Sequence, residues 1–175
     1  SCQNHIVESA KLCPEPFINF SKEENEIGFQ GLYDLGVSRK SDFICFTNRD
    51  SSYLDKKYPG LVDWSYHDFR DSDIHNYLES AQKMTERGYY AIRMGEIVKN
   101  QIDINNPSII DYSTNGKRSD FLDIFLPSKC KFMICSESGL HTVPFVFRKP
   151  IVWVNIVLIW AFHVSSYGVL ITKKF

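Results

Sequence analysis

The stretch FMICSESGLHTVPFVFRKPIVWVN, which runs from Phe132 to Asn155, gives the clearest indication of the fold. It opens with an apolar run, breaks at the polar residues 136–139 (SESG), and closes with a second apolar run, IVWVN. Both runs are short and rich in aromatic and β-branched residues, which is typical of strands buried on both faces of a sheet. We expect two adjacent parallel strands joined by a crossover helix that begins after Gly139.

The same kind of buried run occurs repeatedly upstream of this stretch. Strands are predicted at Phe43–Phe46, Tyr89–Arg93 and Ser108–Tyr112. Between them, apolar residues at helical spacing predict one helix over Ile74–Met84, capped by Ser72 or Asp73 and by Gly88, and another over Ser119–Ser128. Alternating strands and helices predict the α/β class, as a single Rossmann-like domain with a mainly parallel sheet flanked by helices.

The first part of the chain lacks this alternation. Residues 1–41 are polar and weakly periodic, so we interpret them as a connector or as the end of a missing N-terminal domain. Residues 42–175 then form the Rossmann-like domain. A chain of 175 residues is long enough for one substantial core but too short for two Rossmann units.

Composition excludes several classes of function. The formal net charge is −1 and no cluster of Lys and Arg is present, which argues against a nucleic-acid partner. The 5 cysteines show no CxxC pair, so we expect reduced, mostly buried thiols and no zinc site. The apolar run Ile151–Phe162 is too short to span a membrane, and we expect a cytoplasmic protein, with peripheral contact at the inner face of the cytoplasmic membrane left open.

In a parallel sheet the ligand crevice lies beyond the carboxyl ends of the strands, so the residues after each strand are the candidates for a site. Arg49 follows the first strand, and Arg93 and Gly95 lie at the end of the second. An arginine fork suits phosphate or carboxylate, and a glycine lets backbone approach a ligand. A surface ion pair and a plain turn are the alternatives. The long aromatic segment Asn48–Asp71, which contains Arg70, is too long for an ordinary connection.

The turn at Ser136, Glu137, Ser138 and Gly139 is the remaining candidate. A helix start preceded by small residues presents backbone N–H groups that bind anions such as diphosphate. Glu137 could instead accept hydrogen bonds from sugar or ribose hydroxyls, and Ser138 could act only as a helix cap. His141 fits a general base, a phosphate donor or a helix residue without a ligand.

Several ordered blocks together resemble a known family. The blocks are FICFTNRDSSYL, HDFRD, YYAIRMGE, KRSDFLDIFL, FMICSESGL and RKPIVWVN. From about Asp42 to Lys174 the chain resembles the carboxy-terminal, donor-binding half of bacterial glycosyltransferases of surface-polysaccharide biosynthesis. More distantly, it resembles the lipopolysaccharide heptosyltransferases, which have the two-domain GT-B fold. Glu137 stands where those enzymes usually carry Asp, and Pro144 also departs from their pattern.

The resemblance implies a nucleotide-diphosphate sugar as the donor substrate and a glycan or lipid-linked acceptor. It also implies that no metal and no other cofactor is essential. It places Arg49 and Arg93 near the phosphates or the acceptor and residues 136–139 at the donor turn, with Arg70 and Asp120 as weaker candidates. The catalytic base stays unassigned, because in such enzymes it usually comes from the N-terminal domain. The alternatives are a non-catalytic nucleotide- or glycan-binding module and another polysaccharide-modifying enzyme such as a pyruvyl transferase.

Overall fold

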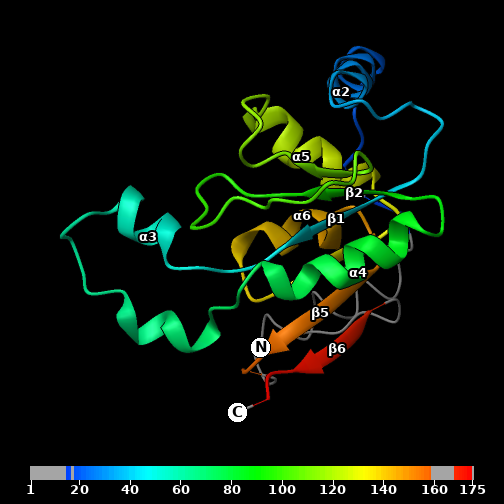
Figure 1. Cartoon of the computed structure of the whole chain (residues 1–175). Coiled ribbons are helices and arrows are strands. Elements are labelled where there is room, and N and C mark those ends of the chain that lie inside the picture. The colour runs from blue at the N-terminus through cyan, green and yellow to red at the C-terminus, as the bar shows by residue number, and fades with distance from the viewer. Residues whose placement is uncertain (1–14, 17, 159–167, 175) are drawn as a thin grey trace.

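A computed structural model describes residues 15–16, 18–158 and 168–174 (Figure 1). It contains a six-stranded sheet in which every pair of neighbouring strands is parallel. The strands are β1 (Phe43–Thr47), β2 (Tyr90–Arg93), β3 (Ile109–Asp111), β4 (Met133–Cys135), β5 (Ile151–Ile156) and β6 (Val169–Thr172). The expected α/β fold with a Rossmann-like parallel sheet is confirmed.

Helices connect and cover these strands. The α-helices are α2 (Lys22–Asp34), α3 (Ser52–Lys57), α4 (His75–Thr85), α5 (Asp120–Lys129) and α6 (Thr142–Val146), and the 3₁₀ turns are η1 (Ser65–Arg70) and η2 (Gly139–His141). The predicted helices 74–84 and 119–128 correspond to α4 and α5. Ser119 caps α5 by accepting a hydrogen bond from the Leu122 N–H. The C-cap of α4 is Glu86, and Gly88, with a φ of 87°, lies in the turn that follows the helix. The crossover element expected after Gly139 is η2 followed by α6.

The order of the strands positions the site. The sheet runs β3-β2-β1-β4-β5-β6, so the chain moves one way from β1 to β3 and the other way from β4 to β6. Right-handed crossovers in opposite directions leave the connections on opposite faces, and a crevice opens between β1 and β4 at their carboxyl ends. A ligand site is therefore expected after Thr47 and after Cys135.

The core lies on both faces of the sheet. Along β1, Phe43 and Cys45 pack against α5 on one face, while Ile44 and Phe46 pack against α4 on the other. Strand residues alternate between faces, so a strand covered on both sides must be apolar at every position. This explains why the continuous apolar runs of the sequence identify the strands.

Helix α2 lies within the range that we interpreted as a connector. Ser21 and Glu24 form a capping box at its start, and Leu32 is buried in the core with Leu35 and Val37. The helix packs closely on α5 through glycine: a Cβ at Gly28 would lie 2.3 Å from the Phe125 ring. The described residues of this range thus contribute to the same core as the sheet.

Strand β6 was not predicted from the sequence, although Val169–Thr172 is a short β-branched run. Cys45, Cys130 and Cys135 are buried and free, as expected, whereas Cys2 and Cys13 lie outside the described residues. The end of the apolar run Ile151–Phe162 also lies outside them. Within the part of the chain that the structure describes, no helix is long and apolar enough to cross a membrane.

Candidate functional site

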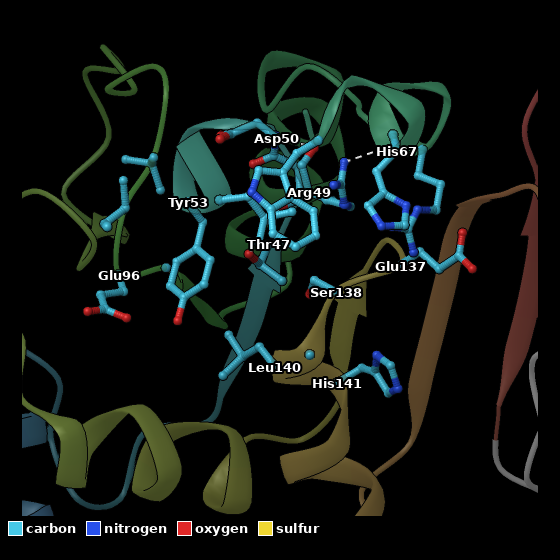
Figure 2. Close-up of a pocket in the computed structure, with 18 of the residues that line it drawn as sticks. Thr47, Arg49, Asp50, Tyr53, His67, Glu96, Glu137, Ser138, Leu140 and His141 are labelled. Atoms are coloured by element: carbon cyan, nitrogen blue, oxygen red, sulfur yellow. Dashed lines mark hydrogen bonds between the residues drawn. The ribbon is translucent and has the colours of Figure 1, made fainter. Parts of the chain in front are cut away.

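A cavity of about 710 Å³ lies at the crevice between β1 and β4. Figure 2 shows how residues that follow β1 meet residues that follow β4 around it. Its lining includes Thr47, Asn48, Arg49, Asp50, Tyr53, Leu54, Trp64, His67, Arg70, Gly95, Glu96, Ile97, Val98, Asp123, Glu137, Ser138, Gly139, Leu140 and His141. Cavities of roughly 300–1,000 Å³ hold drug-sized ligands and cofactors, so a nucleotide fits by volume.

One wall of the cavity is the segment 50–70, which is closed at its base by hydrogen bonds. The Ser72 N–H donates to the Arg49 carbonyl at 3.0 Å, and the Asn48 side chain donates to the Ser72 carbonyl at 2.6 Å. The Arg49 guanidinium pairs with Asp71 and donates to the His67 carbonyl at 3.2 Å. The segment is therefore a closed loop held at its neck, as is common for functional loops.

Arg49 reaches the cavity, but its guanidinium already holds this neck together. The residue is only 8% exposed, and burial together with the nearby Arg70 lowers its pKa. Its Nη1 has two acceptors, one of them the Asp71 carboxylate. Arg49 contributes positive charge to the site, and its first role in the structure is to fix the segment 50–70.

Arg70 is placed differently, because hydrogen bonds fix the backbone around it, while its guanidinium contacts the Phe69 ring, 5.8 Å from the ring centroid, and forms no ion pair among the described residues. Asn155 at the end of β5 donates to the Arg70 carbonyl at 3.2 Å, and Lys173 after β6 donates to the Phe69 carbonyl at 2.8 Å. The Arg70 Nε is buried and has no hydrogen-bond partner among the described residues. The guanidinium forms no ion pair within the described ranges, which leaves its charge available to a ligand in the cavity.

Glu137 brings a carboxylate to the same place. The residue is 7% exposed, and its Oε2 is buried with no hydrogen-bond partner among the described residues. Burial raises the pKa of Glu137, and the positive charges of Arg70 and Arg49 oppose that rise. A buried acceptor without a partner costs about 1–3 kcal/mol, so a hydroxyl or amide donor supplied by a ligand would recover that energy.

The turn around Glu137 divides into a buried part and a part that faces the cavity. Ser136 is fully buried, and its Oγ accepts a hydrogen bond from the Arg49 N–H at 2.6 Å, which joins the ends of β1 and β4. Ser138 precedes η2, but its side chain makes no capping hydrogen bond, and its Oγ has no partner in the described structure. Ser138 and Gly139 line the cavity, whereas Ser136 supports it from behind.

Arg93 is not part of the cavity. Its side chain is fully buried and lies opposite Asp111 of β3, and its Nη1 donates to Asp111 Oδ2 at 3.1 Å and to the Asn100 carbonyl at 2.6 Å. Arg93 Nε and Nη2 have no partner among the described residues, yet they face packed protein. The structure thus separates Arg93 from the other candidates, while Gly95, two residues later, does line the cavity with a φ of 152°.

The weaker candidates divide in the same way. Asp120 has a side chain that is 97% exposed and pairs with Arg118, away from the cavity lining. His141 lines the cavity beside Trp153, with ring centroids 4.6 Å apart, and burial lowers the pKa of its imidazole. His67 also lines it, and burial together with Arg70 and Arg49 lowers its pKa.

Asp123 is a lining residue that the sequence did not reveal. It pairs with Arg118 at 2.6 Å, and its Oδ1 has no partner within the described ranges. Burial raises the pKa of its carboxyl, which Arg118 opposes. Its place on the helix 119–128 was predictable, but its contact with a cavity after β1 and β4 depends on the crossover of α5.

The described residues contain no group of three or more His, Cys, Asp or Glu side chains that could hold a metal ion. That the protein needs no metal for its activity stays a prediction. Five residues of the cavity lining carry a buried hydrogen-bond donor or acceptor with no partner among the described residues: Trp64, Arg70, Asp123, Glu137 and Ser138. Such a set suits an organic ligand that carries both hydroxyls and negative charge.

Fold and site together define the class of this protein as a Rossmann-like α/β domain with a cavity at the switch point of its sheet. Comparisons of the chain with protein-family models, with curated proteins and with solved structures find no match. The function is therefore argued from the geometry of the cavity and from the sequence blocks quoted above.

Proposed function

We propose that this chain is the donor-binding domain of a glycosyltransferase, which transfers a sugar from a nucleotide diphosphate to a glycan or lipid-linked acceptor. The observation that carries the proposal is that two oppositely charged side chains, Arg70 and Glu137, meet in one cavity and form no ion pair among the described residues. A nucleotide-sugar presents an anionic diphosphate next to sugar and ribose hydroxyls. It therefore supplies a partner for each of the two side chains.

In this proposal Arg70 binds the diphosphate. A guanidinium fork donates two parallel hydrogen bonds to phosphate oxygens, and such charge-assisted bonds are about twice as strong as neutral ones. Arg49, held by Asp71, adds a second positive charge nearby. The backbone at Ser138 and Gly139 contributes as well, since the first N–H groups of a helical turn have no partner inside the turn.

Glu137 binds a hydroxyl of the ribose or of the transferred sugar. The terminal torsion of a glutamate is soft, so either carboxylate oxygen can turn toward the cavity. The Ser138 hydroxyl lies one residue away and can both donate and accept. A ligand hydroxyl that donates a hydrogen bond to Glu137 satisfies this buried acceptor. The need to accept such a bond explains why the turn carries a carboxylate.

In the proposed transfer reaction, negative charge develops on the departing diphosphate. The acceptor oxygen forms a bond to the anomeric carbon, the bond from that carbon to the phosphate oxygen breaks, and the electron pair leaves with the diphosphate. Arg70 and Arg49 stabilise this growing negative charge more strongly in the transition state than in the bound donor. The acceptor proton passes to a base that we leave unassigned, consistent with its origin in another domain.

A thermal-shift screen tests the proposal. The purified protein is heated with UDP-, GDP- and ADP-sugars and, in parallel, with phosphoenolpyruvate. A ligand at about 100 times its Kd stabilises the folded state by about 2.7 kcal/mol, which raises Tm by roughly 5–10 °C for a domain of this size. We expect such a rise with one class of nucleotide-sugar. A rise with phosphoenolpyruvate alone would indicate pyruvyl transfer, and no rise with any nucleotide would remove the proposal.

A further inference from the structure

The segment 50–70 holds more exposed large hydrophobic side chains than any other part of the described chain of similar length. Six of the thirteen exposed large hydrophobic side chains among the described residues lie in it: Tyr53, Tyr58, Leu61, Val62, Tyr66 and Phe69. Exposed apolar side chains that gather in one region mark interaction sites more often than those scattered singly. Figure 1 shows this segment, with α3, projecting beyond the carboxyl end of β1.

Within this segment, four rings lie side by side: Tyr58, Trp64, Tyr66 and His67, which we call the aromatic cluster. The Trp64 ring centroid is 6.3 Å from that of Tyr58, 6.3 Å from that of Tyr66 and 6.2 Å from that of His67. The Trp64 and His67 planes are inclined by only 13°, and those of Trp64 and Tyr66 by 29°. The Trp64 ring is thus nearly parallel to His67 and moderately inclined to Tyr66, whereas the Tyr58 plane is tilted from that of Trp64 by 51° and the planes of Tyr66 and His67 are tilted from each other by 41°.

The aromatic cluster is continuous with the cavity. Trp64 and His67 line the cavity, whereas Tyr66, 58% exposed, and Tyr58, 41% exposed, lie outside its lining. A ligand held against Trp64 would therefore extend from the cavity onto the outer rings. The neck formed by Arg49 and Asp71 fixes the base of the segment that carries these rings.

The net charge of the segment 50–70 argues against some classes of ligand. Residues 50–70 contain four acidic side chains (Asp50, Asp55, Asp63 and Asp68) and three basic ones (Lys56, Lys57 and Arg70), so the formal net charge is −1. Anionic membranes and nucleic acids attract segments with an excess of positive charge, which is absent here. Flat rings with polar edges instead suit a neutral ligand that has an apolar face and hydroxyls at its rim.

We infer that the aromatic cluster binds a neutral saccharide of the acceptor, whose C–H face packs on Tyr58, Trp64 and Tyr66 while its reacting hydroxyl reaches the cavity. This inference rests on the proposed function, since it places the acceptor beside the donor. Aromatic side chains provide a large contact area with little loss of conformational entropy, so rigid rings suit the binding of a flexible glycan.

The test is an array of neutral and acidic oligosaccharides, followed by calorimetric titration of the tightest binder. We compare the wild-type chain with the variants Tyr66→Ala, Tyr58→Ala and Trp64→Ala. Tyr33→Ala is the matched control, because Tyr33 is 69% exposed and lies on α2, away from the cavity lining. We expect a neutral saccharide to bind and its Kd to rise about tenfold in Tyr66→Ala and Trp64→Ala, a loss of about 1.4 kcal/mol. The saccharide Kd should rise less in the Tyr58→Ala variant and should be unchanged in Tyr33→Ala.

Nucleotide titrations separate this inference from the proposed function. The nucleotide Kd should be unchanged in Tyr66→Ala and Tyr58→Ala, because neither ring lines the cavity. Nucleotide binding without saccharide binding, or saccharide binding that the Tyr66→Ala and Trp64→Ala variants retain, overturns the inference and leaves the proposed function standing. Binding of acidic glycans only also overturns it. A membrane contact would overturn the inference as well. It would be identified if the Tyr66→Ala variant no longer bound phosphatidylglycerol vesicles while its affinity for the saccharide was unchanged.

Discussion

The ends of β2 and β4 look alike in the sequence and differ in the structure. A charged side chain lies near a glycine at each strand end: Arg93 is the last residue of β2 and precedes Gly95, and Glu137 follows β4 and precedes Gly139. Arg93 is fully buried and has a charge partner in Asp111, 3.1 Å away, whereas Glu137 forms no ion pair among the described residues and lines a cavity. A buried charge with a partner belongs to the fold, and a buried charge without one points to a ligand.

The largest change in stability is expected when Arg93, the buried charge with an ion-pair partner, is replaced. Substituting Arg93→Ala leaves the Asp111 carboxylate without its ion pair, and removing one partner of a buried pair costs about 3–5 kcal/mol. For a domain of this size that lowers Tm by roughly 10 °C. Differential scanning calorimetry measures this decrease in Tm. The control is Arg39→Ala, whose ion pair with Glu26 is exposed and contributes roughly 0–1 kcal/mol. An equal, small effect of both variants would show that Arg93 is not a structural residue.

Arg70→Ala should have an intermediate effect, and on binding rather than on folding. The loss of a hydrogen bond to a charged group weakens binding by about 1.5–3 kcal/mol, so the nucleotide Kd rises by roughly ten- to a hundredfold. Because Arg70 has no ion-pair partner in the described structure, Tm should stay within about 2 °C of the wild type. Calorimetric titration measures the Kd, with Arg39→Ala again as the control. An unchanged Kd would place the diphosphate elsewhere.

The smallest expected effect is a gain in stability from Glu137→Gln. Burial raises the pKa of Glu137, so its carboxyl favours folding below its unfolded pKa and this contribution is lost as pH rises through the folded pKa. Removing the charge should therefore raise Tm at pH 7, by about 2 °C for roughly 1 kcal/mol, and have little effect at pH 3. The rise in Tm that a nucleotide causes should shrink in the same variant.

Glu79→Gln is the control for this substitution, since Glu79 is exposed on α4 and its replacement should leave both Tm and the nucleotide effect unchanged. A lower Tm for Glu137→Gln at pH 7 would contradict the view that the fold bears a cost at this residue for the sake of a ligand.

The sequence predicted those parts of the fold whose apolar pattern is strong. Strands such as Phe43–Thr47 are covered on both faces and so read as unbroken apolar runs. Helix α2 escaped prediction because Gly28 and Gly31 form its contact with α5, and the absence of a side chain gives no hydrophobic periodicity. Its capping box, Ser21 with Glu24, was the one readable signal.

The candidate site was predicted in position but not in detail. The rule that ligands bind at the carboxyl ends of parallel strands led to Arg49, Gly95 and the turn 136–139, and the cavity lies there. Which charges are paired could not be predicted, because Arg93 meets Asp111 through the register of β2 with β3. The position of Arg70 at the cavity likewise depends on hydrogen bonds from Asn155 and Lys173 to the backbone carbonyls of residues 69 and 70, and both donors are distant in sequence.

NMR can show whether the cavity between β1 and β4 binds a nucleotide diphosphate. UDP, GDP and ADP are titrated into protein labelled with ¹⁵N. With the nucleotide that binds, we expect shifts for the backbone amides of Ser138, Gly139 and Leu140 and for the Arg70 Nε–H, with the Arg93 Nε–H unchanged. Shifts that leave residues 137–140 and Arg70 unaffected, or no shifts with any of the three nucleotides, would contradict binding in this cavity.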